Sequence, residues 1–143
     1  HNDLRAIVES LAFDLQRPTF TLINTGETHY PYAPASEPPD RWPRIHGVHG
    51  VFKQMAAGVP LHRSQAPRAF DQDRLDALRQ SQIDVIADVD DAIGMLFDAL
   101  PPRTFVTVTS DHGELFGEDG YFGHGPIPHP KVLEVPFVEG LLR

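Results

Sequence analysis

Residues 103–113 read Arg-Thr-Phe-Val-Thr-Val-Thr-Ser-Asp-His-Gly, and this stretch decides the fold. Its first part is apolar and rich in β-branched residues, which predicts a buried strand over residues 104–109. The strand ends at an acid and an imidazole, Asp111 and His112, and a glycine-rich loop follows up to residue 125. Enzymes of the α/β class present ligands in this way, at the carboxyl end of a strand. We therefore expect a ligand site here.

The rest of the chain alternates between helical and strand patterns. Apolar residues recur every three or four positions in two segments, which predicts amphipathic helices over residues 3–15 and 71–100. Asp71 is the expected N-cap of the second helix. Short runs of apolar and β-branched residues predict strands over residues 19–25 and 132–138. This alternation indicates a layered α/β fold.

A long proline-rich connection spans residues 33–69. A loop of this length inside a compact domain is usually functional. Weak periodicity suggests a short helix over residues 45–57. Three histidines in the loop could indicate metal binding, but solvated loop residues are the better interpretation: His46, His49 and His62. We expect a single, truncated domain over residues 1–143 that contains this loop.

Composition excludes several classes of protein. The 143 residues carry 12 Lys plus Arg against 20 Asp plus Glu, a net charge of −8, so a nucleic-acid partner is not expected. Without cysteine, disulfides and thiolate zinc sites are excluded. No apolar run approaches the roughly 20 residues of a membrane span, and no signal peptide is visible. Because the chain opens on His1 without an initiator Met, we expect that its natural N-terminus is missing and leave its localisation open.

Asp111 and His112 are the strongest candidates for metal binding. A carboxylate and a neutral imidazole are ordinary ligands of divalent cations. Neighbouring residues on a strand point in opposite directions, so both can reach one ion only if the backbone turns, which Gly113 permits. The alternative is a helix-capping aspartate followed by an incidental histidine, and the tripeptide alone favours neither.

Three further residues could contact an anionic ligand. His29 follows the strand predicted over residues 19–25, and a histidine there could bind an oxyanion or protonate a leaving oxygen. His124 lies between two glycines, which allows close approach to a ligand, and Lys131 offers positive charge. The alternatives are structural loop histidines and a solvated lysine.

These elements together resemble the sulfatase-like branch of the sulfatase and alkaline-phosphatase superfamily. The resemblance rests on four stretches, from about residue 18 onward: Asn24 to Tyr32, the long helix with Asp90 to Gly94, Val108 to Gly125, and Leu133 to Val138. It implies an αβα layered sheet of the alkaline-phosphatase type, present as a partial core.

The resemblance also implies roles for the candidate residues. Asp111 and His112 would ligate a divalent metal, which is calcium, magnesium, manganese or zinc depending on the branch. His29 and His124 would contact the sulfate or phosphate group. Members of the superfamily hydrolyse sulfate esters, phosphate mono- or diesters or phosphonates, or transfer phosphoglycerol, so an anionic ester is the expected substrate.

One part of the family pattern is missing from this sequence. The family nucleophile is a formylglycine made from Cys or Ser, or a plain Thr or Ser, and it lies in the N-terminal part with two further acidic ligands. No Cys/Ser-x-Pro-x-Arg element occurs here. The chain therefore resembles the C-terminal half of the catalytic core, which we expect to be inactive alone and to self-associate through exposed apolar surface.

Three interpretations follow for the function. The first is a sulfuric-ester hydrolase. The second is a phosphodiesterase, phosphonate hydrolase or phosphoglycerol transferase, which His112 favours slightly because many sulfatases carry Asn there. The third is an inactive truncated module. An upstream Cys-x-Pro-x-Arg element would favour the first, and a bare Thr or Ser the second.

Overall fold

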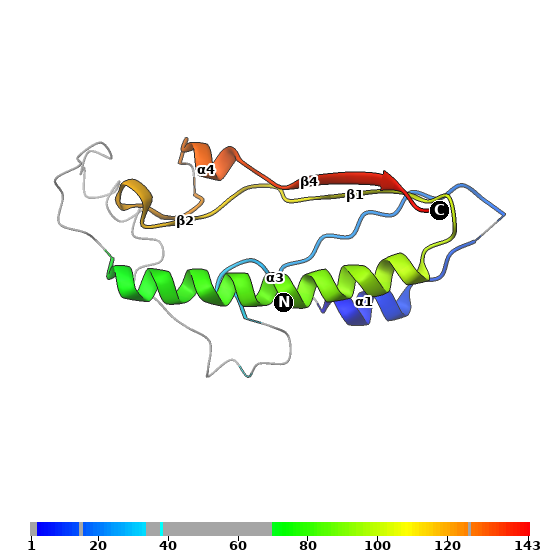
Figure 1. Ribbon diagram of the computed structural model, residues 1–143, viewed down its shortest axis with the longest axis horizontal. Helices are drawn as coiled ribbons and strands as arrows, with labels where there is room; N and C mark the ends of the chain where they lie inside the picture. Colours follow the sequence, from blue (N-terminus) through cyan, green and yellow to red (C-terminus); the bar gives the residue numbers. More distant parts are fainter. Residues whose placement is uncertain (1–2, 15, 34–37, 39–69, 126) are drawn as a thin grey trace. The chain divides into compact units, whose positions relative to one another are not determined.

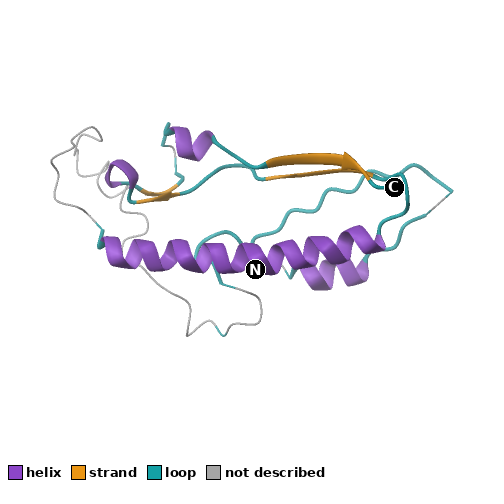
Figure 2. Ribbon diagram, viewed as in Figure 1, coloured by secondary structure: helices purple, strands orange, loops and turns teal. Residues whose placement is uncertain are grey.

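The computed structural model describes residues 3–14, 16–33, 38, 70–125 and 127–143. Helices and short strands are mixed along the chain, which confirms the predicted α/β class (Figures 1 and 2). The elements are α1 (Leu4–Ser10), α3 (Gln72–Ala99), β1 (Phe105–Thr109), β2 (Leu115–Phe116), the 3-10 helix η1 (Glu118–Gly120), β3 (Phe122–Gly123), α4 (Pro130–Leu133) and β4 (Phe137–Leu141).

The chain divides into two compact units. The first takes its residues from His1–Pro43, Gln80–Thr107 and Glu139–Arg143, and the second from Arg44–Arg79 and Val108–Val138. Asp111, His112, His124 and Lys131 all belong to the second unit, whereas His29 belongs to the first.

Helix α1 forms the core of the first unit together with the C-terminal part of α3. Leu4 and Val8 lie one turn apart on α1 and bury their side chains against Ala92. Asp3 caps the helix, because its Oδ1 accepts a hydrogen bond of 3.1 Å from the amide of Ala6. The helix ends at Ser10, short of the predicted residue 15, since the backbone of Leu11 is extended.

Helix α3 follows the prediction closely. The amide of Asp73 donates to Oδ1 of Asp71 over 3.1 Å, which confirms Asp71 as the residue that starts the helix. Its buried stripe comprises Leu75, Leu78, Val85 and Ala92. The helix ends at Ala99, just before two prolines that cannot continue it.

The predicted strand over residues 19–25 is wrong. In the described part of the chain, the sheets pair only β1 with β4 and β2 with β3, so this segment has no neighbouring strand. Phe20 is 91% exposed and Leu22 is 82% exposed, so the segment is not buried either. Composition suited a strand, but a strand also needs a partner for its backbone hydrogen bonds.

The strand predicted over residues 104–109 is present as β1, but its residues alternate between exposed and half-buried, so the predicted burial is wrong. Its partner β4 runs antiparallel to it. At one end the amide of Arg103 donates to the carbonyl of Leu142 over 3.0 Å, and the amide of Leu142 donates to Thr104 over 2.9 Å. At the other end the Thr109 hydroxyl donates to the carbonyl of Pro136 over 2.8 Å.

The last strand begins later than predicted, because a short helix replaces its first residues. Pro130 starts α4, and the His129 Nδ1 atom accepts a hydrogen bond of 3.1 Å from the amide of Lys131. Proline suits the first helical position, where its missing N–H is not needed. The strand therefore covers Phe137–Leu141 instead of residues 132–138.

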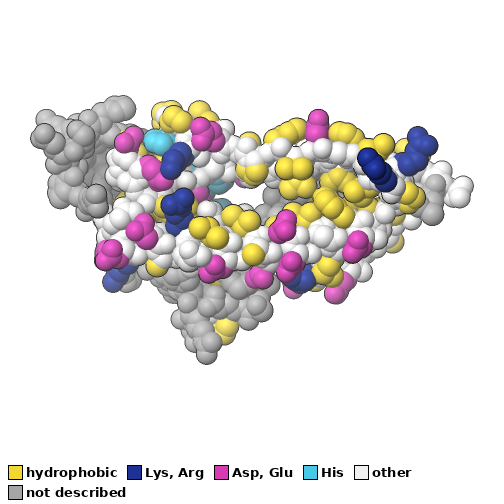
Figure 3. Space-filling view, in the orientation of Figure 1, with side chains coloured by type: hydrophobic (Ala, Val, Ile, Leu, Met, Phe, Trp, Pro, Cys, Tyr) yellow, Lys and Arg dark blue, Asp and Glu magenta, His cyan; other side chains and the backbone are white. Residues whose placement is uncertain are grey.

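Strands β1 and β4 carry exposed apolar side chains. Hydrophobic side chains appear along this strand pair in the space-filling view (Figure 3). The most exposed of them are Phe105, Phe137, Val138 and Leu141, each about 60% exposed. Two strands alone cannot bury both of their faces.

Candidate metal and anion site

The antiparallel pair of β2 and β3 brings the ligand-bearing loop together. Leu115 pairs with Gly123, and Phe116 pairs with Phe122. One step further in the same register, Glu114 lies opposite His124. Gly117 opens the connecting turn with a φ of 110°, a conformation that glycine adopts without strain.

Apolar packing fixes this hairpin in the second unit. The Leu115 side chain is fully buried and packs with Ile127 and Val132, with Tyr121 against them. The Phe116 and Phe122 rings make an edge-to-face contact with centroids 6.0 Å apart. The residues on either side of the hairpin are thereby held in place.

Gly113 joins the Asp111–His112 pair to α4 at very close range. Its amide donates to the carbonyl of Val132 over 2.8 Å. A Cβ atom at this position would collide with the carbonyl oxygen of Lys131 and lie 2.9 Å from that of Glu134. Only glycine fits here, so α4 and the loop after β1 are locked together.

Asp111 and His112 lie directly after β1, where the loop backbone has turned. Oδ1 of Asp111 is 3.6 Å from Nε2 of His112. Two ligand atoms bound to one ion at about 2.1 Å, with a tetrahedral angle between them, are roughly 3.4 Å apart. The two side chains therefore present their donor atoms at nearly the separation that a shared cation requires.

The hydrogen bond on the other side of the His112 ring defines its tautomer. Nδ1 lies 2.9 Å from the carbonyl oxygen of Gly113. A carbonyl can only accept, so Nδ1 carries the proton, and Nε2 holds the lone pair of the neutral ring. Histidines that ligate metals usually make such a bond from their second ring nitrogen.

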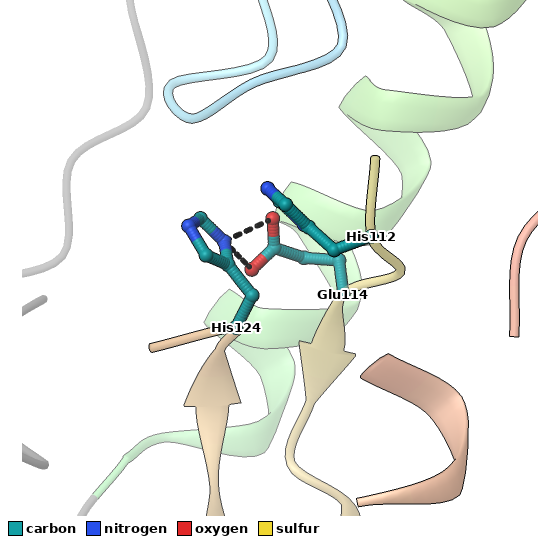
Figure 4. Close-up of side chains that lie close together, drawn as sticks. All are labelled: His112, Glu114 and His124. Carbon is teal, nitrogen blue, oxygen red and sulfur yellow. Dashed lines mark hydrogen bonds and ion pairs between the residues drawn. The ribbon is translucent and has the colours of Figure 1, made fainter. Parts of the chain in front are cut away.

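His124 is held by a buried carboxylate (Figure 4). Its Nδ1 lies 3.2 Å from Oε1 and 3.3 Å from Oε2 of Glu114. The Glu114 side chain is only 8% exposed, whereas the His124 side chain is 33% exposed. The His124 ring also stacks on the His112 ring, with centroids 3.7 Å apart.

One group of potential metal ligands therefore comprises His112, Glu114 and His124. One donor atom from each lies within 4.8 Å of the others. Asp111 lies outside this group, with a side chain that is 85% exposed. Glu114 was not predicted as a site residue, although antiparallel pairing across the Gly117–Gly120 turn would have placed it beside His124.

Lys131 lies on α4, and its ammonium group donates to Oε1 of Glu118 over 2.8 Å. Partial burial acts to raise the pKa of the Glu118 carboxyl. Hydrogen bonds from Lys131 and from the amides of Phe116 and Glu118, with the Lys131 charge, outweigh burial and lower this pKa below its usual value. Glu118 thus partly neutralises the charge of Lys131.

His29 lies in a compact turn of the first unit. The amide of His29 donates to Gly26 over 3.1 Å, and the amide of Tyr32 donates to His29 over 2.9 Å. The His29 ring is exposed, and its Nδ1 lies 3.0 Å from the carbonyl oxygen of Tyr30. As in His112, Nδ1 carries the proton and donates it in a hydrogen bond to a backbone carbonyl. Convergence of His29 with the loop after β1 remains a prediction.

Several expectations concern residues outside the described part of the chain. The helix suggested over residues 45–57 and the histidines at positions 46, 49 and 62 lie there.

The fold and the site together define an α/β protein with a group of side chains after a strand end that could hold a metal ion. The chain belongs to the sulfatase family, since the family model described as Sulfatase matches residues 3–138. This confirms the resemblance noted from the sequence. The family comprises hydrolases that generally use a divalent metal and act on anionic esters. No curated protein and no solved structure matches the chain.

Within the described ranges, no helix combines the length and the apolar character needed to cross a membrane.

Proposed function

We propose that this chain supplies the metal-binding and anion-binding part of the active site of a divalent-metal-dependent sulfuric-ester hydrolase. The observation that carries the proposal is the Asp111–His112 pair. Their donor atoms lie 3.6 Å apart, and His112 is held in the Nδ1–H tautomer by the Gly113 carbonyl. Together with membership of the sulfatase family, this supports a role in binding metal.

The residues present fit a divalent cation. Asp111 would offer a carboxylate oxygen and His112 the lone pair on Nε2, a mixed donor set that suits zinc or manganese. A bound cation supplies Lewis-acid polarisation of a nonbridging ester oxygen and activation of a nucleophile. The Gly113 carbonyl keeps the His112 ring oriented for this task.

The remaining oxygens of the ester group are assigned to His29 and His124. Hydrogen bonds from these rings would orient the sulfate and stabilise the negative charge that develops in the transition state. Lys131 is a third candidate contact, and it would have to exchange its bond to Glu118 for a bond to the anion. None of these side chains is assigned the role of nucleophile.

The attacking group is therefore none of the residues assigned here. The sequence has no cysteine and no Cys/Ser-x-Pro-x-Arg element. We expect the isolated chain to bind a metal and an oxyanion without turning over an ester.

A phosphoric-ester hydrolase or a related transferase is the second candidate, because His112 stands where many sulfatases carry Asn. Binding of sulfate and of vanadate, an analogue of phosphoryl transfer, to the metal-loaded chain distinguishes the two. Tighter binding of sulfate supports the first candidate, and tighter binding of vanadate supports the second.

The metal assignment is tested by calorimetric titration of the chain with Mn²⁺ and Zn²⁺. Asp111→Ala and His112→Ala should each lower the affinity at least tenfold. Asp98→Ala is the matched control, because Asp98 is an exposed acid on α3, and this variant should bind like the wild type. If both site variants keep the wild-type affinity, the assignment is wrong.

A further inference from the structure

Glu114 is a buried acid for which the proposed mechanism has no role. Its side chain is 92% removed from solvent, and such burial is unfavourable for a carboxylate unless it is hydrogen-bonded. Both of its oxygens approach a single atom, Nδ1 of His124 (Figure 4). The structure therefore places a carboxylate beside the histidine that is assigned to the anion.

This contact restricts the His124 ring in two ways. An ionised carboxylate only accepts hydrogen bonds, so Nδ1 of His124 must carry a proton whether the ring is neutral or charged. The ring is also held in orientation, with Glu114 on its Nδ1 side and the His112 ring stacked at 3.7 Å against its face. Nε2 lies on the side of the ring opposite to Glu114.

We propose that Glu114 is a positioning residue: it holds the Nδ1 side of His124 so that Nε2 is presented to the oxygens of an anionic ester bound beside His112. In the protonated ring both nitrogens donate, Nδ1 to Glu114 and Nε2 to the ester oxygen. Glu114 itself touches neither the ester nor the reacting atoms. This inference rests on the proposed function, because it assumes that His124 contacts the anion.

A rival role for Glu114 follows from the same cluster. Its donor atom lies within 4.8 Å of those of His112 and His124, so Glu114 could be a metal ligand instead. The two roles make opposite predictions. A positioning residue controls the tautomer of His124 and the affinity for the anion, whereas a ligand controls the affinity for the metal.

The first test is the tautomer of the neutral His124 ring, read from two-bond proton–nitrogen correlation spectra of the metal-free chain at alkaline pH. The wild type should show Nδ1–H at His124. His129 is an internal control with the opposite pattern, because its Nδ1 accepts from the amide of Lys131. Glu114→Leu should lose the Nδ1–H pattern, and Glu114→Gln, which keeps an oxygen acceptor, should retain it.

The second test compares anion and metal affinities in the same variants. In the Mn²⁺-loaded chain, Glu114→Leu should weaken sulfate or vanadate binding at least tenfold, with a smaller loss for Glu114→Gln. Metal affinity should stay within twofold of the wild type in both. Glu139→Leu, at an exposed acid on β4, should change neither affinity.

Two results would overturn the inference. One is an unchanged His124 tautomer in Glu114→Leu, and the other is a loss of metal affinity in Glu114→Gln as large as in His112→Ala. If Glu114→Leu does not fold, Glu114→Gln still separates a ligand from a positioning residue. If the wild type binds no anion, the proposed function fails in that respect, while the tautomer still decides whether Glu114 orients His124.

Discussion

Replacing Gly113 by alanine should disrupt the second unit at the point where the Asp111–His112 loop meets α4. The added Cβ would overlap the Lys131 carbonyl, which is backbone and cannot move without displacing α4. Overpacking of this kind costs about 1–3 kcal/mol. Loss of the 2.8 Å bond from the Gly113 amide to Val132 adds about 0.5–1.5 kcal/mol.

The two terms together predict a loss of about 2–4 kcal/mol in the free energy of unfolding, which lowers the Tm by on the order of 10 °C for a chain of this size. Thermal unfolding followed by circular dichroism measures this loss. Gly94→Ala is the matched control, because nothing lies within 4 Å of a Cβ at this position of α3. This control should be stabilising by about 0.5–1 kcal/mol, since alanine favours helix.

Gly113→Ala should also weaken divalent-metal binding, because the Gly113 carbonyl orients His112. A Gly113→Ala chain with the wild-type Tm and the wild-type metal affinity would refute the reasoning. It would mean that the close contact between this loop and α4 is absent in solution.

Three further predictions concern stability. Leu115→Ala should lower the free energy of unfolding in urea by about 2–5 kcal/mol, because Leu115 is fully buried. Leu133 is 74% exposed, so Leu133→Ala should change it by no more than about 0.5 kcal/mol. Equal losses in the two variants would contradict the assigned core. Asp3→Ala removes the α1 cap and should lower the free energy of unfolding by about 1 kcal/mol. An unchanged urea unfolding curve would argue against that cap. The pKa of Glu118 is lower in the folded chain than in the unfolded chain. Its contribution to the free energy of unfolding is therefore complete above the unfolded pKa of about 4.3, and it disappears as the pH falls through the lower folded value. The stability difference between the wild type and Glu118→Gln should therefore shrink in urea titrations below about pH 4, and a difference that grows on acidification would be inconsistent with the pairing to Lys131.

Local patterns predicted the elements whose structure depends on local interactions. The helical period of α3 and its cap at Asp71 are properties of neighbouring residues, and the structure has both, although Ile83 and Ile86 of the predicted apolar face are half exposed. Strand β1 was equally visible as a β-branched run that stops at Asp111. In both segments the local pattern of residue types was enough to select the secondary structure.

Elements that depend on partners were predicted less well. Residues 19–25 have the composition of a strand, but pairing with another strand is not a property of the segment itself. Helix α4 was missed because four residues carry too little periodicity to predict a helix.

The candidate site shows the same division. Asp111 and His112 are adjacent in sequence and could be recognised as donors from residue type alone. The contact of Glu114 with His124 joins residues ten positions apart, and it depends on the register of β2 and β3. A glycine-rich stretch of this kind gives little indication of register, since turn length and pairing set it.

The most direct test of the proposed metal site is an anomalous-scattering map from crystals of the chain grown with Mn²⁺. The proposal predicts one strong peak about 2.0–2.2 Å from Oδ1 of Asp111 and Nε2 of His112, ordinary distances for oxygen and imidazole ligands. A saturating concentration of Mn²⁺ that gives no peak at this pair, or a peak bound only by other residues, would contradict it.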